Sequence, residues 1–231
     1  MKKILLNALI LCTTYLSAQE YQWTSYNFNV ASEDVEVVGK IMDDFYSEKG
    51  NKNEGVSVYL FENHFNDNSI NFSHSIVFTG TLDAMGAQYN NGQNTKWDLF
   101  IAKISQYLTK HSAASGSGLI SYGKPGTHPV QNIYWLDVED PNKFKTAFTK
   151  YNSKFNPADR RVTLGNFRTG RSPEGENHYV LVGVNDFKTA FDTSLYRKNN
   201  KAANDAWKEY MKNNGDVRLV RSTTRVMLGK W

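Results

Sequence analysis

Two histidines, each opening a short apolar stretch, are the first candidates for chemistry in this 231-residue sequence. His74 opens "HSIVFTG", and His178 opens "HYVLVGV" in the later part of the chain. Histidine changes charge close to neutral pH, so either residue could serve as a general acid or base. That role requires a group that orients the ring and a path by which substrate reaches it. We therefore keep His74 and His178 as candidate catalytic residues.

The residues around the two histidines also support a purely structural role. Successive side chains of a β-strand point to opposite faces. His74 shares its face with Ile76 and Phe78, and His178 shares its face with three valines. Bulky apolar faces are expected to pack against helices. The alternation therefore favours two structural histidines on the helix side of a sheet, and the catalytic alternative stays open.

The arginines are the second candidate group, because all of them lie between Arg160 and Arg225. Arg221 and Arg225 alternate onto one face of the last predicted strand, residues 217–228. Guanidinium groups bind carboxylates through paired hydrogen bonds, so these two side chains are candidate ligands for an anion. The alternative is pairing between the halves, since residues 19–128 carry a net charge of −5 and residues 129–231 a net charge of +7.

Aromatic residues could supply a binding surface for a flat or apolar ligand. The sequence has thirteen Tyr, thirteen Phe and five Trp. Tyr134 and Trp135 lie together in the predicted strand of residues 130–138, and we include both as candidate ligand-binding residues. Filling of the core is the alternative role for such side chains.

Other kinds of site have little support in the sequence. The five histidines show no spacing that would place two metal ligands on one helical face, so we predict no metal site. His111 and His128 lie where an axial haem ligand could lie, but no ligation motif accompanies them, and we predict no cofactor. The charge of residues 19–231 is nearly balanced, which argues against nucleic acid as a partner.

The first eighteen residues read as an export signal. Lys2 and Lys3 precede an apolar run from Ile4 to Leu16, and small residues end at Ala18. The run is too short to span a bilayer, so we expect cleavage after Ala18 and no membrane association of the mature chain. Cys12, the only cysteine, lies within this segment. We therefore expect an exported protein, periplasmic or secreted, without disulfides.

The remaining elements repeat one order twice. Residues 21–30, 55–63, 70–79 and 119–122 read as strands, with helices over residues 33–49 and 82–110. After the loop "GKPGTHP" the same βαββαβ order returns, with strands at residues 130–138, 161–167, 178–184 and 217–228. We predict an α+β fold of two tandem ferredoxin-like units, residues 19–124 and 129–231.

This element order resembles that of the dimeric α+β barrel superfamily, in which two ferredoxin-like units face each other as one barrel with helices outside. Here one chain would supply both units and form a pseudo-dimeric barrel. The resemblance implies several activities, including cofactor-independent monooxygenation and isomerisation, and does not choose among them. Two functions remain open: binding of a small organic or anionic ligand or a partner in or around the barrel, and catalysis on an aromatic or other small organic substrate.

Overall fold

The computed structural model describes residues 21–66, 70–90, 94–123, 128–157, 159–192 and 194–231. The predicted signal of residues 1–18 lies outside this part of the chain. The first half contains β1 (Tyr21–Asn29), η1 (Ser32–Asp34), α1 (Val35–Tyr46), β2 (Ser57–Asn66), β3 (His74–Gly80), α2 (Leu82–Asn90), α3 (Thr95–Ile104) and β4 (Thr109–Tyr122). The second half contains β5 (Val130–Val138), α4 (Pro141–Phe155), β6 (Arg161–Thr169), β7 (His178–Val184), α5 (Phe187–Phe191), α6 (Lys201–Asn213) and β8 (Val217–Lys230).

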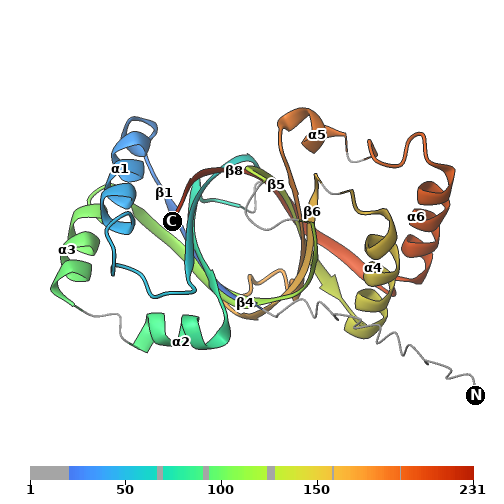
Figure 1. Cartoon of the computed structure of the whole chain (residues 1–231), viewed down its shortest axis with the longest axis horizontal. Coiled ribbons are helices and arrows are strands. Elements are labelled where there is room, and N and C mark those ends of the chain that lie inside the picture. Colours follow the sequence, from blue (N-terminus) through green and yellow to red (C-terminus); the bar gives the residue numbers. More distant parts are fainter. Residues whose placement is uncertain (1–20, 67–69, 91–93, 124–127, 158, 193) are drawn as a thin grey trace, which may run out of the picture.

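The eight strands close into one antiparallel barrel in the order β1-β3-β2-β8-β5-β7-β6-β4. Each half contributes four neighbouring strands, β4-β1-β3-β2 and β8-β5-β7-β6, which is the ferredoxin-like order in both cases. The halves join where β2 pairs with β8 and where β4 pairs with β6. Figure 1 looks along the barrel and shows the helices of the two halves on opposite sides of it.

Apolar helix faces cover the outside of the barrel. Val38 and Met42 lie one turn apart on α1 and are fully buried against the first half of the sheet. Phe144 and Phe148 do the same on α4 in the second half. The start of α4 follows from its sequence, because the Asp140 carboxylate accepts hydrogen bonds from the amides of Asn142 and Lys143, at 3.1 and 3.0 Å. Among the described helices, none has the length and apolar character needed to cross a bilayer.

One strand differs from the sequence prediction. β4 begins at Thr109, although the sequence indicates a helical region up to residue 110 and a strand only over 119–122. The small residues of "SAASGSG" are the reason. A β-carbon on Gly116 would lie 2.6 Å from the Trp23 ring, and one on Gly118 would lie 2.2 Å from the Tyr21 ring. The glycines therefore allow two aromatic rings of β1 to lie across β4.

Candidate functional site

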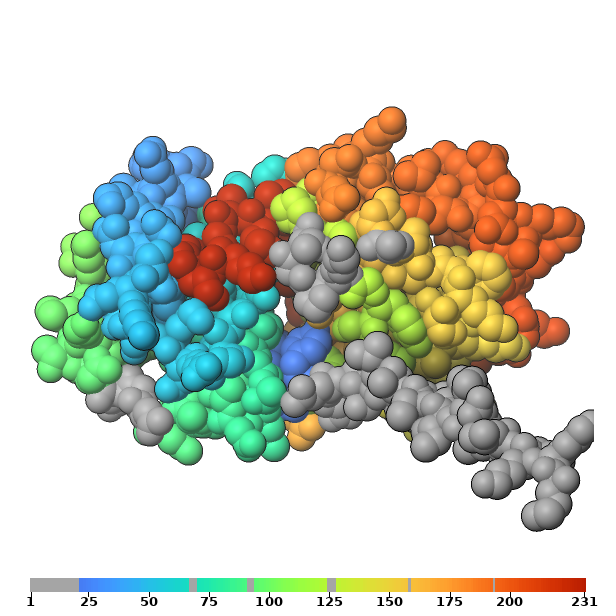
Figure 2. Space-filling model, in the orientation of Figure 1, coloured from blue at the N-terminus to red at the C-terminus, as the bar shows by residue number. Residues whose placement is uncertain are grey.

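The barrel encloses a cavity of about 670 Å³. Side chains from all eight strands line it, and they come from the face opposite to the helices. In the space-filling view along the same direction, atoms of β1 are visible between the two halves (Figure 2). The aromatic side chains among the lining residues are Tyr21, Trp23, Tyr59, Phe61, Phe72, Trp135, Phe167 and Tyr179.

Three of these rings form a cluster that fills part of the lumen. Trp23 meets Phe167 and Tyr179 edge to face, with ring centroids 5.3 and 5.5 Å apart, and Phe167 and Tyr179 are 5.8 Å apart. All three are buried, as is the neighbouring Ile133. The cavity is therefore the space left beside an aromatic cluster, which is suited to a flat or apolar ligand.

Two arginines lie on one row across the wall of the second half. In the strand register Arg225 of β8 is opposite Gln131 of β5, Gln131 is opposite Gly183 of β7, and Gly183 is opposite Arg161 of β6. All four residues line the cavity. Because Gly183 has no side chain, the row has a gap between Gln131 and Arg161.

Arg225 is held without an acidic partner among the described residues. Its Nε donates to the Gln131 side-chain oxygen at 3.0 Å, and its Cζ lies 3.7 Å from the centroid of the Phe61 ring. Burial lowers the pKa of Arg225 from 12.5 to about 9, and the phenols of Tyr179 and Tyr21 act weakly in the opposite direction. A positive charge is thus enclosed by the protein beside the cavity.

Arg161 approaches the same region from the other end of the row. Its Nε donates weakly to the Thr163 hydroxyl at 3.4 Å, and its Cζ lies 5.9 Å from the Tyr21 ring centroid. It too makes no ion pair within the described part of the chain. Burial raises the pKa of Tyr179 well above its usual value, whereas Arg225 and Arg161 both pull it down. Both guanidinium groups therefore act on the same buried phenol.

Arg221 is different, because a carboxylate neutralises it. Its Nη2 lies 2.7 Å from the Glu176 carboxylate, which is almost fully buried. Glu176 also accepts hydrogen bonds from the Ser172 amide at 3.1 Å and from the Ser172 hydroxyl. Arg221 lies 4.9 Å from the Trp135 ring centroid. The pair belongs to the cavity wall, and its charge is balanced.

His128 is a lining residue that has both an orienting group and a free ring nitrogen. Its Nδ1 lies 3.0 Å from the Asn185 side-chain oxygen. An amide oxygen only accepts, so Nδ1 carries the proton and Nε2 keeps a lone pair. That Nε2 is buried and has no hydrogen-bond partner among the described residues. A β-carbon on Gly183 would lie 3.0 Å from the His128 β-carbon and 3.6 Å from that of Arg161, so His128 and Arg161 flank the gap.

The structure separates the residues selected from the sequence into two groups. Arg221, Arg225 and Trp135 line the cavity. Tyr134 does not: it packs against the helix-side core around Phe148, because neighbouring residues of a strand cannot share a face. From the sequence we placed Tyr134 and Trp135 in one ligand-binding site, and the structure corrects this prediction for Tyr134.

His74 and His178 also lie on the helix side and do not line the cavity. The Ser73 hydroxyl lies 2.8 Å from His74 Nδ1, and the Asn177 amide oxygen lies 2.8 Å from His178 Nδ1. Burial lowers the pKa of both histidines. Two buried rings, each bonded to its preceding residue, fit the structural role that the alternation favours.

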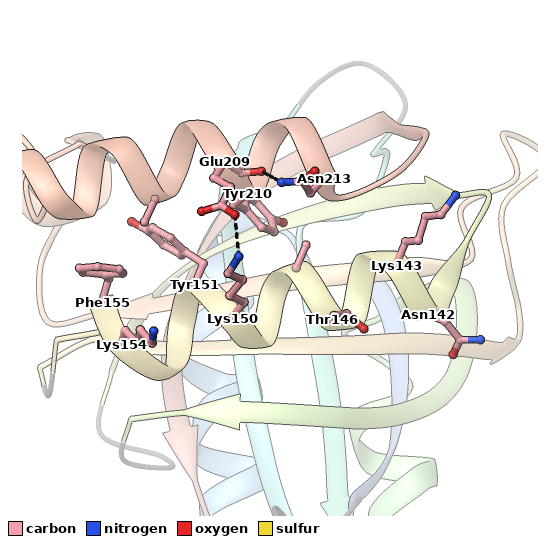
Figure 3. A pocket seen from close by; sticks show the side chains of 12 residues that line it. Asn142, Lys143, Thr146, Lys150, Tyr151, Lys154, Phe155, Glu209, Tyr210 and Asn213 are labelled. Atoms are coloured by element: carbon pink, nitrogen blue, oxygen red, sulfur yellow. Dashed lines mark hydrogen bonds and ion pairs between the residues drawn. The ribbon is translucent and has the colours of Figure 1, made fainter.

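A second hollow, of about 770 Å³, lies on the outer surface between α4 and α6 (Figure 3). Lys150 of α4 reaches across it to Glu209 of α6, at 2.6 Å, and Tyr151 and Tyr210 form part of its floor. The ion pair is exposed to solvent and occupies the hollow itself. We therefore place the candidate site in the lumen, where oriented polar groups and aromatic rings line one cavity.

Metal binding has no support in the described residues, since no three His, Cys, Asp or Glu side chains come together there. From the sequence we did not assign Arg161 or Glu176 to the lumen, and we considered His128 only as a position for a haem ligand. Alternation along β6 places Arg161 on the same face as Thr163, which was a usable signal. His128 and Glu176 lie just outside strands, so no periodicity could assign them a direction.

Solved structures share this fold over nearly the whole chain. A proposed monooxygenase from Lactobacillus acidophilus matches with a TM-score of 0.63 at 14% identity, covering 92% of this chain and 95% of its own. A proposed monooxygenase from Fusobacterium nucleatum gives 0.58 at 16%, covering 91% and 93%. An anthrone oxidase-like protein gives 0.52 at 9%, covering 92% and 93%.

No family model matches the sequence, and no curated protein matches it. The closed antiparallel barrel flanked by helices is the architecture predicted from element order, and these solved structures share it. At these identities the likeness shows the fold alone.

Proposed function

We propose that this protein binds a small aromatic organic molecule inside the barrel. The observation that carries the proposal is the cavity of about 670 Å³, lined by aromatic rings and by a few oriented polar side chains. Its volume lies within the range of roughly 300–1,000 Å³ that is usual for small-molecule sites. Arg221 and Arg225 lie over the rings of Trp135 and Phe61, so a flat ligand in the cavity would meet apolar and charged groups side by side.

Native mass spectrometry of protein isolated from its source tests this proposal. We expect a retained small molecule that leaves on denaturation, with an aromatic absorbance. Trp135→Ala should reduce retention, because it removes one wall of the cavity. Trp207→Ala is the matched control, since Trp207 lies on α6, outside the barrel. Protein that retains nothing and binds no aromatic compound in solution would contradict the proposal.

A second candidate function is cofactor-independent oxidation or isomerisation of an aromatic substrate, and His128 is the observation that favours it. The Asn185 amide fixes the imidazole tautomer, and Nε2, which is buried and has no described partner, can take a proton from an acidic C–H or O–H group of the substrate once the ring turns toward the lumen. Return of that proton to another carbon gives an isomer. The neighbouring Arg161 and Arg225 stabilise the anion formed between the two steps.

Oxidation needs molecular oxygen as a second substrate. The substrate anion gives electrons to O2, one oxygen atom enters the product as a carbonyl, and the other leaves as water. The conversion of anthrone to anthraquinone is a reaction of this kind, and we suggest it as an assay because an anthrone oxidase-like protein shares the fold. Oxygen uptake by the wild-type protein that is lost in His128→Gln and kept in His64→Gln would support catalysis. Ligand retention without turnover of any aromatic substrate would leave binding as the function.

We also propose that the chain is exported, and that its halves arose by duplication of one ferredoxin-like unit. The apolar leader with its small residues supports the first part, and the repeated strand order supports the second. The N-terminal sequence of protein recovered from the periplasm or medium of the source should begin at Gln19. A mature protein that keeps Met1 would contradict export by cleavage.

A further inference from the structure

The charges around the cavity do not balance. Its lining includes Arg161, Arg171, Arg221 and Arg225, whereas Glu176 is the one carboxylate among the described lining residues. Glu176 is already paired with Arg221. The lumen therefore holds an excess of positive charge from groups that are always protonated near neutral pH.

Such an excess is unfavourable where the arginines are partly buried. An ion that leaves water is destabilised unless another charge or a set of hydrogen bonds replaces the solvent. Arg225 retains one hydrogen bond to Gln131 and a contact with the Phe61 ring, and the Arg161 guanidinium has one weak bond to Thr163. Several N–H donors of each group have no described acceptor, so an added anion would satisfy them.

The positions of the two arginines define the shape of the missing group. They lie at the two ends of one row of the wall, with Gln131 and Gly183 between them, and His128 packs where Gly183 has no side chain. A planar oxyanion matches the fork of a guanidinium group through two parallel hydrogen bonds. The rings of Phe61 and Tyr21 lie beside the two guanidinium groups, so the remainder of the molecule meets apolar surface.

We propose that the lumen binds an aromatic carboxylate, with its carboxylate group between Arg225 and Arg161. This inference rests on the proposed function and adds the chemical class of the ligand. Gln131 holds Arg225 in place, and the aromatic part of the ligand lies against the cluster around Trp23 and Tyr179. The carboxylate supplies the negative charge that the wall lacks.

Matched pairs of aromatic acids and amides test the proposal. The probes are benzoate, 2-naphthoate and 2-anthroate, each compared with its carboxamide, which has the same shape without the charge. Binding to the full mature chain is followed by calorimetry and by the fluorescence of Trp23 and Trp135, which line the cavity. We expect at least one acid to bind about tenfold or more tightly than its amide, the range of a charge-assisted hydrogen bond.

Variants identify the residues that cause the difference. Arg225→Gln and Arg161→Gln should each weaken acid binding about tenfold and leave amide binding nearly unchanged. Arg225→Lys should restore part of the lost affinity, because it keeps the charge without the fork. Arg218→Gln is the control on the same strand, since Arg218 is exposed, is paired with Asp137 and does not line the cavity. Circular dichroism and thermal unfolding verify that each variant is folded.

The possible outcomes separate this inference from the proposed function. Equal binding of acids and amides would overturn the carboxylate assignment and keep an aromatic ligand in the lumen. Preference for acids that Arg225→Gln and Arg161→Gln both retain would overturn the assigned position. Failure of every acid and every amide to bind would overturn the carboxylate proposal, and an empty protein in the native mass spectrum would then overturn the proposed function as well.

Discussion

The two halves of the barrel have the same strand order but different inner walls. In the first half the described lining residues include Ser25, Ser57, Tyr59, Ser75 and Val77, and none of the described ones is an Asp, Glu, Lys or Arg. The second half contributes four arginines and Glu176. One scaffold thus supports a neutral wall and a charged wall, because strand pairing depends on the backbone and leaves the inward side chains free to differ.

The outer faces of the two halves are much more alike. His74 and His178 occupy the first position of equivalent strands, each ring is bonded to the preceding residue, and burial lowers the pKa of each. Helices pack on both outer faces, and close packing restricts what those positions can hold. Helix packing therefore keeps the outer faces of the two halves similar, whereas the side chains that line the lumen differ between the halves.

Removal of the Glu176 carboxylate should have the largest effect on stability. Glu176→Gln leaves Arg221 as a largely buried charge without its partner, and we expect a loss of about 3 kcal/mol in the free energy of unfolding. Chemical denaturation measures it. Glu174→Gln is the matched control, because the Glu174 side chain is exposed and only its backbone oxygen accepts from Arg218. Equal stability of the two variants would show that the charged wall does not depend on this pair.

Adding a methyl group at Gly165, beside the aromatic cluster, should have the next largest effect on stability. A β-carbon in Gly165→Ala would lie 2.2 Å from the Tyr179 ring, so we expect a loss of about 2 kcal/mol from overpacking. Gly39→Ala on α1 meets nothing within 4 Å and should stabilise the protein by roughly 0.5 kcal/mol through helix propensity. Thermal and chemical unfolding compare the two. A neutral Gly165→Ala would mean that the lumen cluster repacks easily.

Arg225→Met makes the charged wall more like the neutral one. Because Arg225 is partly buried and has no acidic partner among the described residues, its replacement should stabilise the ligand-free protein by about 1 kcal/mol. Chemical denaturation in the absence of ligand is the measurement, with Arg218→Met as the exposed control. Destabilisation by Arg225→Met would indicate that the Gln131 bond and the Phe61 contact outweigh the burial of the charge.

The outer histidines should give the smallest effect, and it should be similar in both halves. Their pKa values are lowered in the folded state, so below about pH 6.5 the unfolded chain takes up protons that the folded protein does not. Stability should therefore fall as the pH drops from 6.5 toward the lower folded values. His74→Gln and His178→Gln should each reduce this slope by a similar amount in denaturation at pH 7.5, 6.5 and 5.5. Unequal reductions would show that His74 and His178 do not have equivalent surroundings.

Much of the fold could be predicted from the sequence, whereas the site could be predicted only in part. Apolar spacing located the helices that became α1 and α4, and alternation placed His74 on the helix side of the sheet. The start of β4 was missed, because a run of small residues has no apolar period until Trp23 and Tyr21 pack over it.

That Arg161 and Arg225 line the same cavity could not be predicted from either strand alone. Those strands are at opposite edges of one unit, and it is the curvature of the closed barrel that turns both side chains toward one lumen. Strand alternation places a side chain on a face, but it does not give the distance between faces across a barrel. Glu176 and His128 lie in connections, where no period assigns a direction.

Both halves of this barrel belong to one polypeptide, which removes a restriction that a symmetric dimer carries. In a homodimer each wall residue appears twice, related by a two-fold axis, so four arginines on one wall would become eight around the lumen. A single chain can instead place neutral side chains on one side of the lumen and positively charged ones on the other. The ligand with one charged end that we propose would then be held in a single orientation.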